Sequence, residues 1–137
     1  MLNIFPDLLF LQILAPFILR IALGVMFIWI GYSYLFKDRV AAIALLSNKW
    51  PKIAKPSILF GGGFAIVTGL LLIVGLFTQG AAIAGALIAM DALFAKFLYK
   101  EFDKVVKYSK MFYILILIIS LSLIVSGAGA FAIDLPL

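Results

Sequence analysis

The stretch Ser57–Met90 reads SILFGGGFAIVTGLLLIVGLF, then TQG, then AAIAGALIAM, and it contains no charged side chain. As one straight helix it would be about 50 Å long, which exceeds the roughly 30 Å hydrocarbon core of a bilayer. The only polar break in it is Phe77–Gly80. The pattern therefore predicts two membrane-spanning helices joined by a tight turn at that break.

The composition of the whole chain also indicates a membrane protein. The 137 residues are 66% hydrophobic and 12% charged, whereas soluble domains average about 45–50% apolar and about 25% charged residues. Cysteine and histidine are both absent, which excludes disulfides, thiol redox chemistry, haem ligation through histidine and the common zinc sites. We accordingly expect no metal site.

The apolar segments predict a single all-α domain over residues 1–137, an integral membrane four-helix bundle with up-and-down topology. The expected spans cover residues of about 16–36, 57–77, 80–99 and 111–126. Residues 1–15 are interrupted by proline and aspartate and are expected to form a short interfacial segment rather than a cleaved signal peptide. Pro16 suits the first turn of the first helix.

The basic residues indicate the orientation of the chain. Nine of the Lys and Arg residues lie in two connections, 37–56 and 100–110, and none lies in the terminal segments or in the central turn. The positive-inside rule places both connections in the cytoplasm and both termini outside. We expect a bacterial or archaeal cytoplasmic membrane, with the net charge of +5 reporting topology rather than a nucleic-acid partner.

Small residues are expected to mediate the packing of the spans. Ala81, Gly85 and Ala89 recur every four residues in the third span, and such a row lets a partner helix approach closely. Gly24 and Gly31 mark one face of the first span in the same way. The sequence leaves open whether the partner helix belongs to the same chain or to another copy.

Three ionisable side chains fall inside the expected spans, and such groups are functional candidates because they are costly in lipid. Lys96 lies within about a turn of the cytoplasmic edge and is expected to extend out to the interface. Arg20 lies about 6 Å inside the outer end of its span, within reach of Asp7 or Asp134. It either pairs with one of these carboxylates or binds an anionic substrate or a quinone carbonyl.

Asp91 lies deeper, about 16 Å from the outer end of the third span. Thr68 and Ser120 fall at similar depth, so in an up-and-down bundle these three side chains are expected to converge in the interior. One interpretation is a neutral carboxyl group that links helices by hydrogen bonds. The other is a proton-exchanging site linked to a quinone or a transported solute.

Three segments resemble the DoxX/DoxD-like family of small four-helix membrane proteins. They are the arginine-containing first span (Leu19–Phe36), the glycine-rich second span with its short turn into the third (residues 61–88), and the small-residue ending with its aspartate (Ser126–Leu137). The resemblance carries over Arg20 and Asp134 as site residues.

The chain also departs from that family pattern. Members often have a histidine and a lysine late in the first span, a glutamate in the second span and an arginine after the threonine of the turn. The corresponding residues here are Ile30, Tyr34, the apolar surroundings of Ala65, and Gln79. Asp91 is a candidate replacement for the missing acid.

The resemblance implies an accessory or quinone-interacting subunit of a membrane redox system, not catalytic alone, because some members resemble the membrane subunit of a thiosulfate:quinone oxidoreductase. Quinone is then the expected cofactor, bound non-covalently. Expected partners are membrane lipid, redox proteins and further copies of the chain. Two alternatives remain: a small transporter or channel component with an ion or proton site at Asp91, and a structural helper that assembles through Ala81, Gly85 and Ala89.

Overall fold

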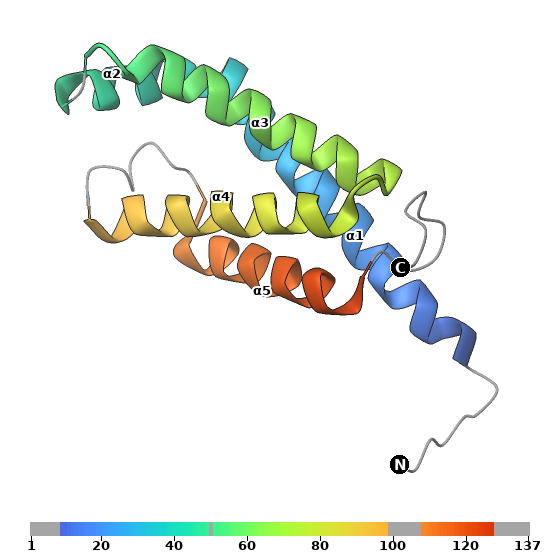
Figure 1. The fold of residues 1–137 in the computed structure, drawn as a ribbon. Coiled ribbons are helices and arrows are strands. Elements are labelled where there is room, and N and C mark those ends of the chain that lie inside the picture. Colours follow the sequence, from blue (N-terminus) through green and yellow to red (C-terminus); the bar gives the residue numbers. More distant parts are fainter. Residues whose placement is uncertain (1–8, 50, 99–107, 128–137) are drawn as a thin grey trace.

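The computed structural model describes residues 9–49, 51–98 and 108–127. Every element in these ranges is helical, which confirms the all-α class (Figure 1). The elements are α1 (Leu9–Tyr32), the π-helical turn η2 (Ser33–Lys37), α2 (Arg39–Lys49), α3 (Ala54–Val74), α4 (Thr78–Leu98) and α5 (Lys110–Ser126).

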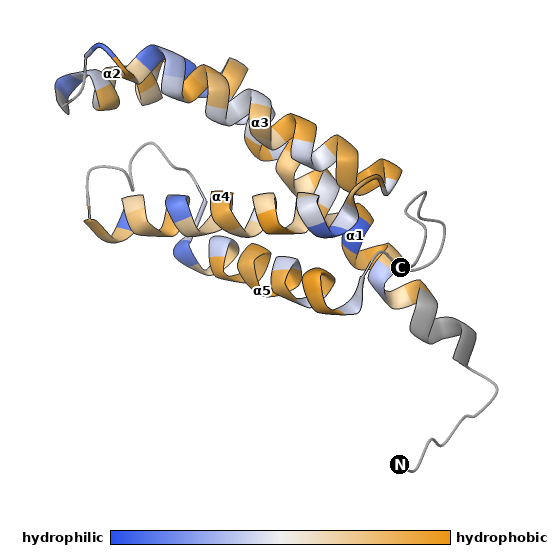
Figure 2. Cartoon of the chain, viewed as in Figure 1, coloured by the Kyte–Doolittle hydropathy of each residue, from blue (hydrophilic) through white to orange (hydrophobic). Residues whose placement is uncertain are grey.

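Three segments are long and apolar enough to cross a membrane: Leu14–Lys37, Ala54–Val74 and Thr78–Leu98. Figure 2 shows hydrophobic residues along their length, on outward as well as inward sides. The expected membrane environment is thereby supported. Helix α5 has 17 residues, which is the lower limit of about 17 residues for a span. The fourth crossing and the outer location of both termini stay predictions.

Helices α1 and α3 pack against each other through two pairs of glycines. A Cβ atom on Gly24 would lie 2.8 Å from the carbonyl oxygen of Gly69, and one on Gly31 would lie 2.6 Å from that of Gly62. The earlier glycine of α1 meets the later glycine of α3, and the later one meets the earlier, so the two helices run antiparallel. Glycine is required because only a residue without Cβ lets the two backbones approach this closely.

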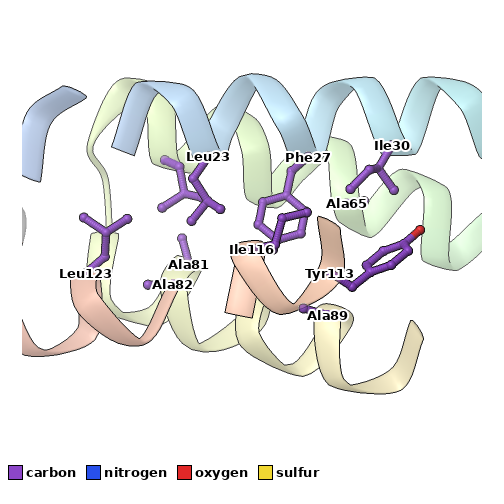
Figure 3. Close-up of a cluster of buried hydrophobic side chains, with 11 residues drawn as sticks. Leu23, Phe27, Ile30, Ala65, Ala81, Ala82, Ala89, Tyr113, Ile116 and Leu123 are labelled. Carbon is purple, nitrogen blue, oxygen red and sulfur yellow. The ribbon is translucent and has the colours of Figure 1, made fainter. Parts of the chain in front are cut away.

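Helix α4 packs against α1 and α5 through the row of small residues. A Cβ atom on Gly85 would lie 2.7 Å from the Phe27 ring and 3.3 Å from Ser120 Oγ. Ala81 and Ala89 lie in the same buried cluster (Figure 3). The helices of this chain therefore cover the row, so the alternative in which it binds a separate protein is not supported by this arrangement.

The turn between α3 and α4 lies at Gly75–Phe77, earlier than the expected Phe77–Gly80. Gly75 adopts a left-handed conformation, with φ of 76°. The N–H groups of Gly75 and Leu76 both donate to the carbonyl of Leu71, at 2.8 and 3.1 Å, and this satisfies the end of α3. Gly75, rather than the polar pair Thr78 and Gln79, sets the turn, and Thr78 begins α4.

The first helix also begins earlier than expected. Helix α1 starts at Leu9 and continues through Pro16, which lies inside the helix rather than in its first turn. Proline removes one backbone hydrogen bond, but apolar helices of membrane proteins tolerate it when their surroundings compensate. The three glycines Gly61–Gly63 likewise leave α3 continuous.

Candidate functional site

The structure does not bring all the predicted site residues together in one site. The side chain of Arg20 is 1% exposed, and its guanidinium carbon lies 5.4 Å from the centre of the Phe17 ring. Asp7 and Asp134 lie outside the described residues, so pairing of Arg20 with either remains a prediction. Thr68 and Ser120 are buried, 2% and 0% exposed.

The expectation that Asp91 faces the interior is wrong. Its side chain is exposed, on a side of α4 that also presents exposed Leu87, Met90 and Phe94. The reason is helical periodicity. Asp91 follows Ala89 by two residues, or about 200° around the helix axis, and Ala89 faces the core.

Lys96 departs from its prediction in the opposite direction to Asp91. Its side chain is buried, whereas it was expected to extend out to the interface. Its side chain is only 3% exposed, and its ammonium group donates a hydrogen bond to the carbonyl of Tyr108. The same nitrogen lies 5.9 Å from the centre of the Tyr113 ring. Lys96 follows Ala89 by seven residues, which places it on the same face of α4.

Tyr108, which precedes α5, and Tyr113 of α5 contact this lysine, and Tyr34 of η2 lies beside Tyr113. In η2 the N–H of Asp38 donates to the carbonyl of Ser33 at 2.8 Å, and this wider turn leaves Ser33 buried and Tyr34 half-buried. Ser33 Oγ lies 3.2 Å from Tyr108 Oη. We call Ser33, Tyr34, Lys96, Tyr108 and Tyr113 the lysine–tyrosine cluster.

Tyr113 lies deepest in the lysine–tyrosine cluster, with 1% of its side chain exposed. Its ring extends from α5, with the hydroxyl directed toward the side of α1 and α3 (Figure 3). That hydroxyl forms no well-aligned hydrogen bond within the described ranges, but the Tyr34 hydroxyl lies close enough to share a weak one with it. Incomplete hydrogen bonding of a buried polar group is unfavourable, so this hydroxyl is one of the buried donors in the described core that could still bind an acceptor.

Aromatic rings enclose the lysine–tyrosine cluster on the α5 side. The ring of Phe112 stacks on that of Tyr108 with 4.8 Å between centres, and it meets the ring of Tyr113 edge to face at 5.8 Å. Tyr108 and Tyr113 also meet edge to face, at 6.4 Å. The site thus combines an ammonium group and hydroxyl groups with flat apolar surfaces.

Comparison with known proteins identifies the family. The family model DoxX matches residues 15–98, which is more than half of the chain. The chain belongs to the DoxX family. No curated protein and no solved structure matches it.

Two of the positions at which the sequence departs from the expected family pattern lie near the lysine–tyrosine cluster. Ile30 and Ala65 are both 1% exposed and belong to the same buried cluster as Tyr113 (Figure 3). Gln79, in contrast, is exposed in the first turn of α4. In this part of the described core the buried charge is that of Lys96 of α4, and Asp91 lies within electrostatic range of Tyr34.

The lysine–tyrosine cluster is suited to bind a hydrogen-bond acceptor. An ammonium group and a phenol are strong donors, and they are stronger in an apolar interior than in water. No three His, Cys, Asp or Glu side chains come together within the described ranges to hold a metal ion.

Helical periodicity in the sequence predicts that Lys96 faces the core, whereas its depth in the span does not. Residues 81, 85, 89 and 96 share one face of a helix with 3.6 residues per turn, so the small-residue row itself directs Lys96 inward. No sequence feature marked Ser33 or Tyr113, because their positions depend on the π-helical turn and on how α5 packs.

We predict that Asp91→Leu raises the unfolding temperature of the DoxX-family protein in lipid nanodiscs. An aspartate near the centre of a span costs about 2.5–3.5 kcal/mol on insertion scales, and Asp91 is exposed about 20 Å along α4. Thr68→Leu is the matched control: it enlarges a side chain that is 2% exposed and is expected to lower the temperature. Lower stability of Asp91→Leu would place Asp91 in a polar contact instead.

Proposed function

We propose that this DoxX-family protein is an accessory membrane subunit of a quinone-linked redox system, and that the quinone headgroup binds at the lysine–tyrosine cluster. One observation carries the proposal. The Tyr113 hydroxyl is buried without a well-aligned hydrogen bond within the described residues, with Tyr34 as a neighbour, and the buried ammonium group of Lys96 lies 5.9 Å from the centre of its ring. Both can donate to a carbonyl oxygen of a quinone ring.

The surroundings of the donors also suit a quinone. The rings of Tyr108 and Phe112, which stack on each other, make the surroundings of the donors aromatic and apolar, and aromatic rings prefer offset-stacked or edge-to-face contacts. When bound, a quinone would supply two-electron redox chemistry that no side chain supplies. The chain has neither histidine nor cysteine, which supports assigning the electron donor to a partner protein and an accessory role to this chain.

The proposed topology places the quinone near one membrane surface. Lys96 lies in the last turn of α4, and Tyr113 lies in the first turns of α5. These ends adjoin the connections 37–56 and 100–110, which the positive-inside rule assigns to the cytoplasm. With α5 as a fourth span, both termini are outside, and the lysine–tyrosine cluster lies within the cytoplasmic half of the bilayer.

Tyr113→Phe tests the proposal by separating binding from stability. Removing a hydroxyl that forms no well-aligned hydrogen bond is expected to change the free energy of unfolding by at most about 1 kcal/mol. The same change removes one hydrogen bond to the quinone and should weaken binding of a quinone analogue roughly fivefold to tenfold. Thermal unfolding with and without the analogue gives both the stability of the variant and its binding of the analogue.

Ser120→Ala is the matched control, since it also removes a fully buried hydroxyl of α5 that has no partner among the described residues. Ser120 lies seven residues beyond Tyr113, about 10 Å along the helix, so analogue binding should not change. Equal binding by wild type and Tyr113→Phe would contradict the proposed site. Proton-dependent solute uptake by the purified protein in liposomes would instead support the transporter alternative.

A further inference from the structure

Cationic side chains are concentrated where η2, α2 and α3 meet. Lys37, Lys52 and Lys55 are exposed, and Arg39 is half-buried. Asp38 is the only acid between residues 37 and 56, so these cations exceed the acid available to neutralise them. Figure 2 shows hydrophilic residues in α2, in the connection and at the beginning of α3, whereas the rest of α3 is mainly hydrophobic. Like charges this close repel one another unless an anion lies between them.

The cations are held on a packed scaffold. Helix α2 contacts both η2 and α3 and lies beside the beginning of α3 (Figure 1). Ala42 of α2 and Ala54 of α3 are buried, 5% and 1% exposed. We call η2, α2 and the residues 51–56 the basic platform. Because α2 packs on α3, the basic platform holds the backbone positions of these cations near one another.

Apolar side chains are exposed among these charges. Val40 is 82% exposed, Ile53 is 61% exposed and Phe36 is 69% exposed. Ile53 lies between Lys52 and Lys55 in the sequence. Exposed apolar residues interspersed with lysines are typical of segments that lie at the boundary between headgroups and acyl chains. A soluble anion would use only the charges, whereas a lipid uses both kinds of side chain.

We propose that the basic platform binds the headgroups of anionic phospholipids in the leaflet against which it lies. The phosphates accept hydrogen bonds from Lys52 and Lys55, and the acyl chains contact Ile53 and Val40. The attraction follows from the density of positive charge next to a membrane surface that carries anionic lipid. This site is separate from the quinone site in the core and does not depend on it.

The test uses the full-length protein in nanodiscs of phosphatidylcholine, with or without phosphatidylglycerol. Phosphatidylglycerol is expected to raise the unfolding temperature of the wild type. Lys52→Gln and Lys55→Gln should each reduce that increase, and together remove about half of it or more. Both side chains are exposed, so neither variant should alter the stability in phosphatidylcholine alone.

Lys110→Gln is the charge-matched control, since the ammonium group of Lys110 lies 4.9 Å from the centre of the Phe97 ring and outside the basic platform. Phosphatidylglycerol should raise the unfolding temperature of Lys110→Gln as much as that of the wild type. Native mass spectrometry should show fewer retained phosphatidylglycerol molecules only for the variants of the basic platform. An undiminished increase in the double variant, or an equal increase caused by inorganic phosphate with phosphatidylcholine, would overturn the proposal.

Discussion

Gly69→Ala will lower the free energy of unfolding by about 1–3 kcal/mol, which is the usual cost of overpacking a core. The added Cβ would lie 2.6 Å from the carbonyl oxygen of Gly24 and 3.0 Å from the backbone nitrogen of Ile28. Both contacts are with backbone atoms, which cannot rotate away as the end of a side chain can. Helices α1 and α3 must separate, and each then loses contacts along its length.

Gly63→Ala is the control in the same helix. A Cβ at Gly63 meets nothing within 4 Å, so the higher helix propensity of alanine should make this variant neutral or up to ~1 kcal/mol more stable. Chemical or thermal unfolding in the same detergent compares the two variants. Equal stability of Gly69→Ala and Gly63→Ala would show that α1 and α3 do not approach through their glycines.

Lys96→Met will weaken binding of a quinone analogue by roughly tenfold to a hundredfold, because hydrogen bonds to charged groups contribute about 1.5–3 kcal/mol. Methionine keeps a long unbranched side chain in the buried space but removes the ammonium group that reaches Tyr108 and Tyr113. The dissociation constant can be measured by isothermal titration calorimetry in detergent.

Lys110→Met removes the same charge near the same end of the bundle, and it should leave the dissociation constant unchanged. Its ammonium group lies against the Phe97 ring rather than in the lysine–tyrosine cluster. If both variants bind the analogue as tightly as the wild type, Lys96 serves only to satisfy the carbonyl of Tyr108, and the quinone site is elsewhere.

Helix α4 illustrates which features of the candidate site the sequence predicts and which it does not. The depth of Asp91 suggested a polar centre with Thr68 and Ser120, but depth does not tell which side of a helix a residue occupies. The row of Ala81, Gly85 and Ala89 did contain that information, since small residues mark the side that another helix approaches closely. Applied to Lys96 and Asp91, the same periodicity places the lysine inside and the aspartate outside.

The sequence alone determined the membrane environment, the all-α class and the small residues at which helices meet. These properties follow from composition, from the length of uncharged stretches and from local periodicity, all of which a linear chain displays. Only the tertiary structure decided that Ser33, Lys96 and Tyr113 share a site, because those residues are far apart in sequence. Their meeting depends on a π-helical turn and on the close packing of four helices, and no single segment encodes either.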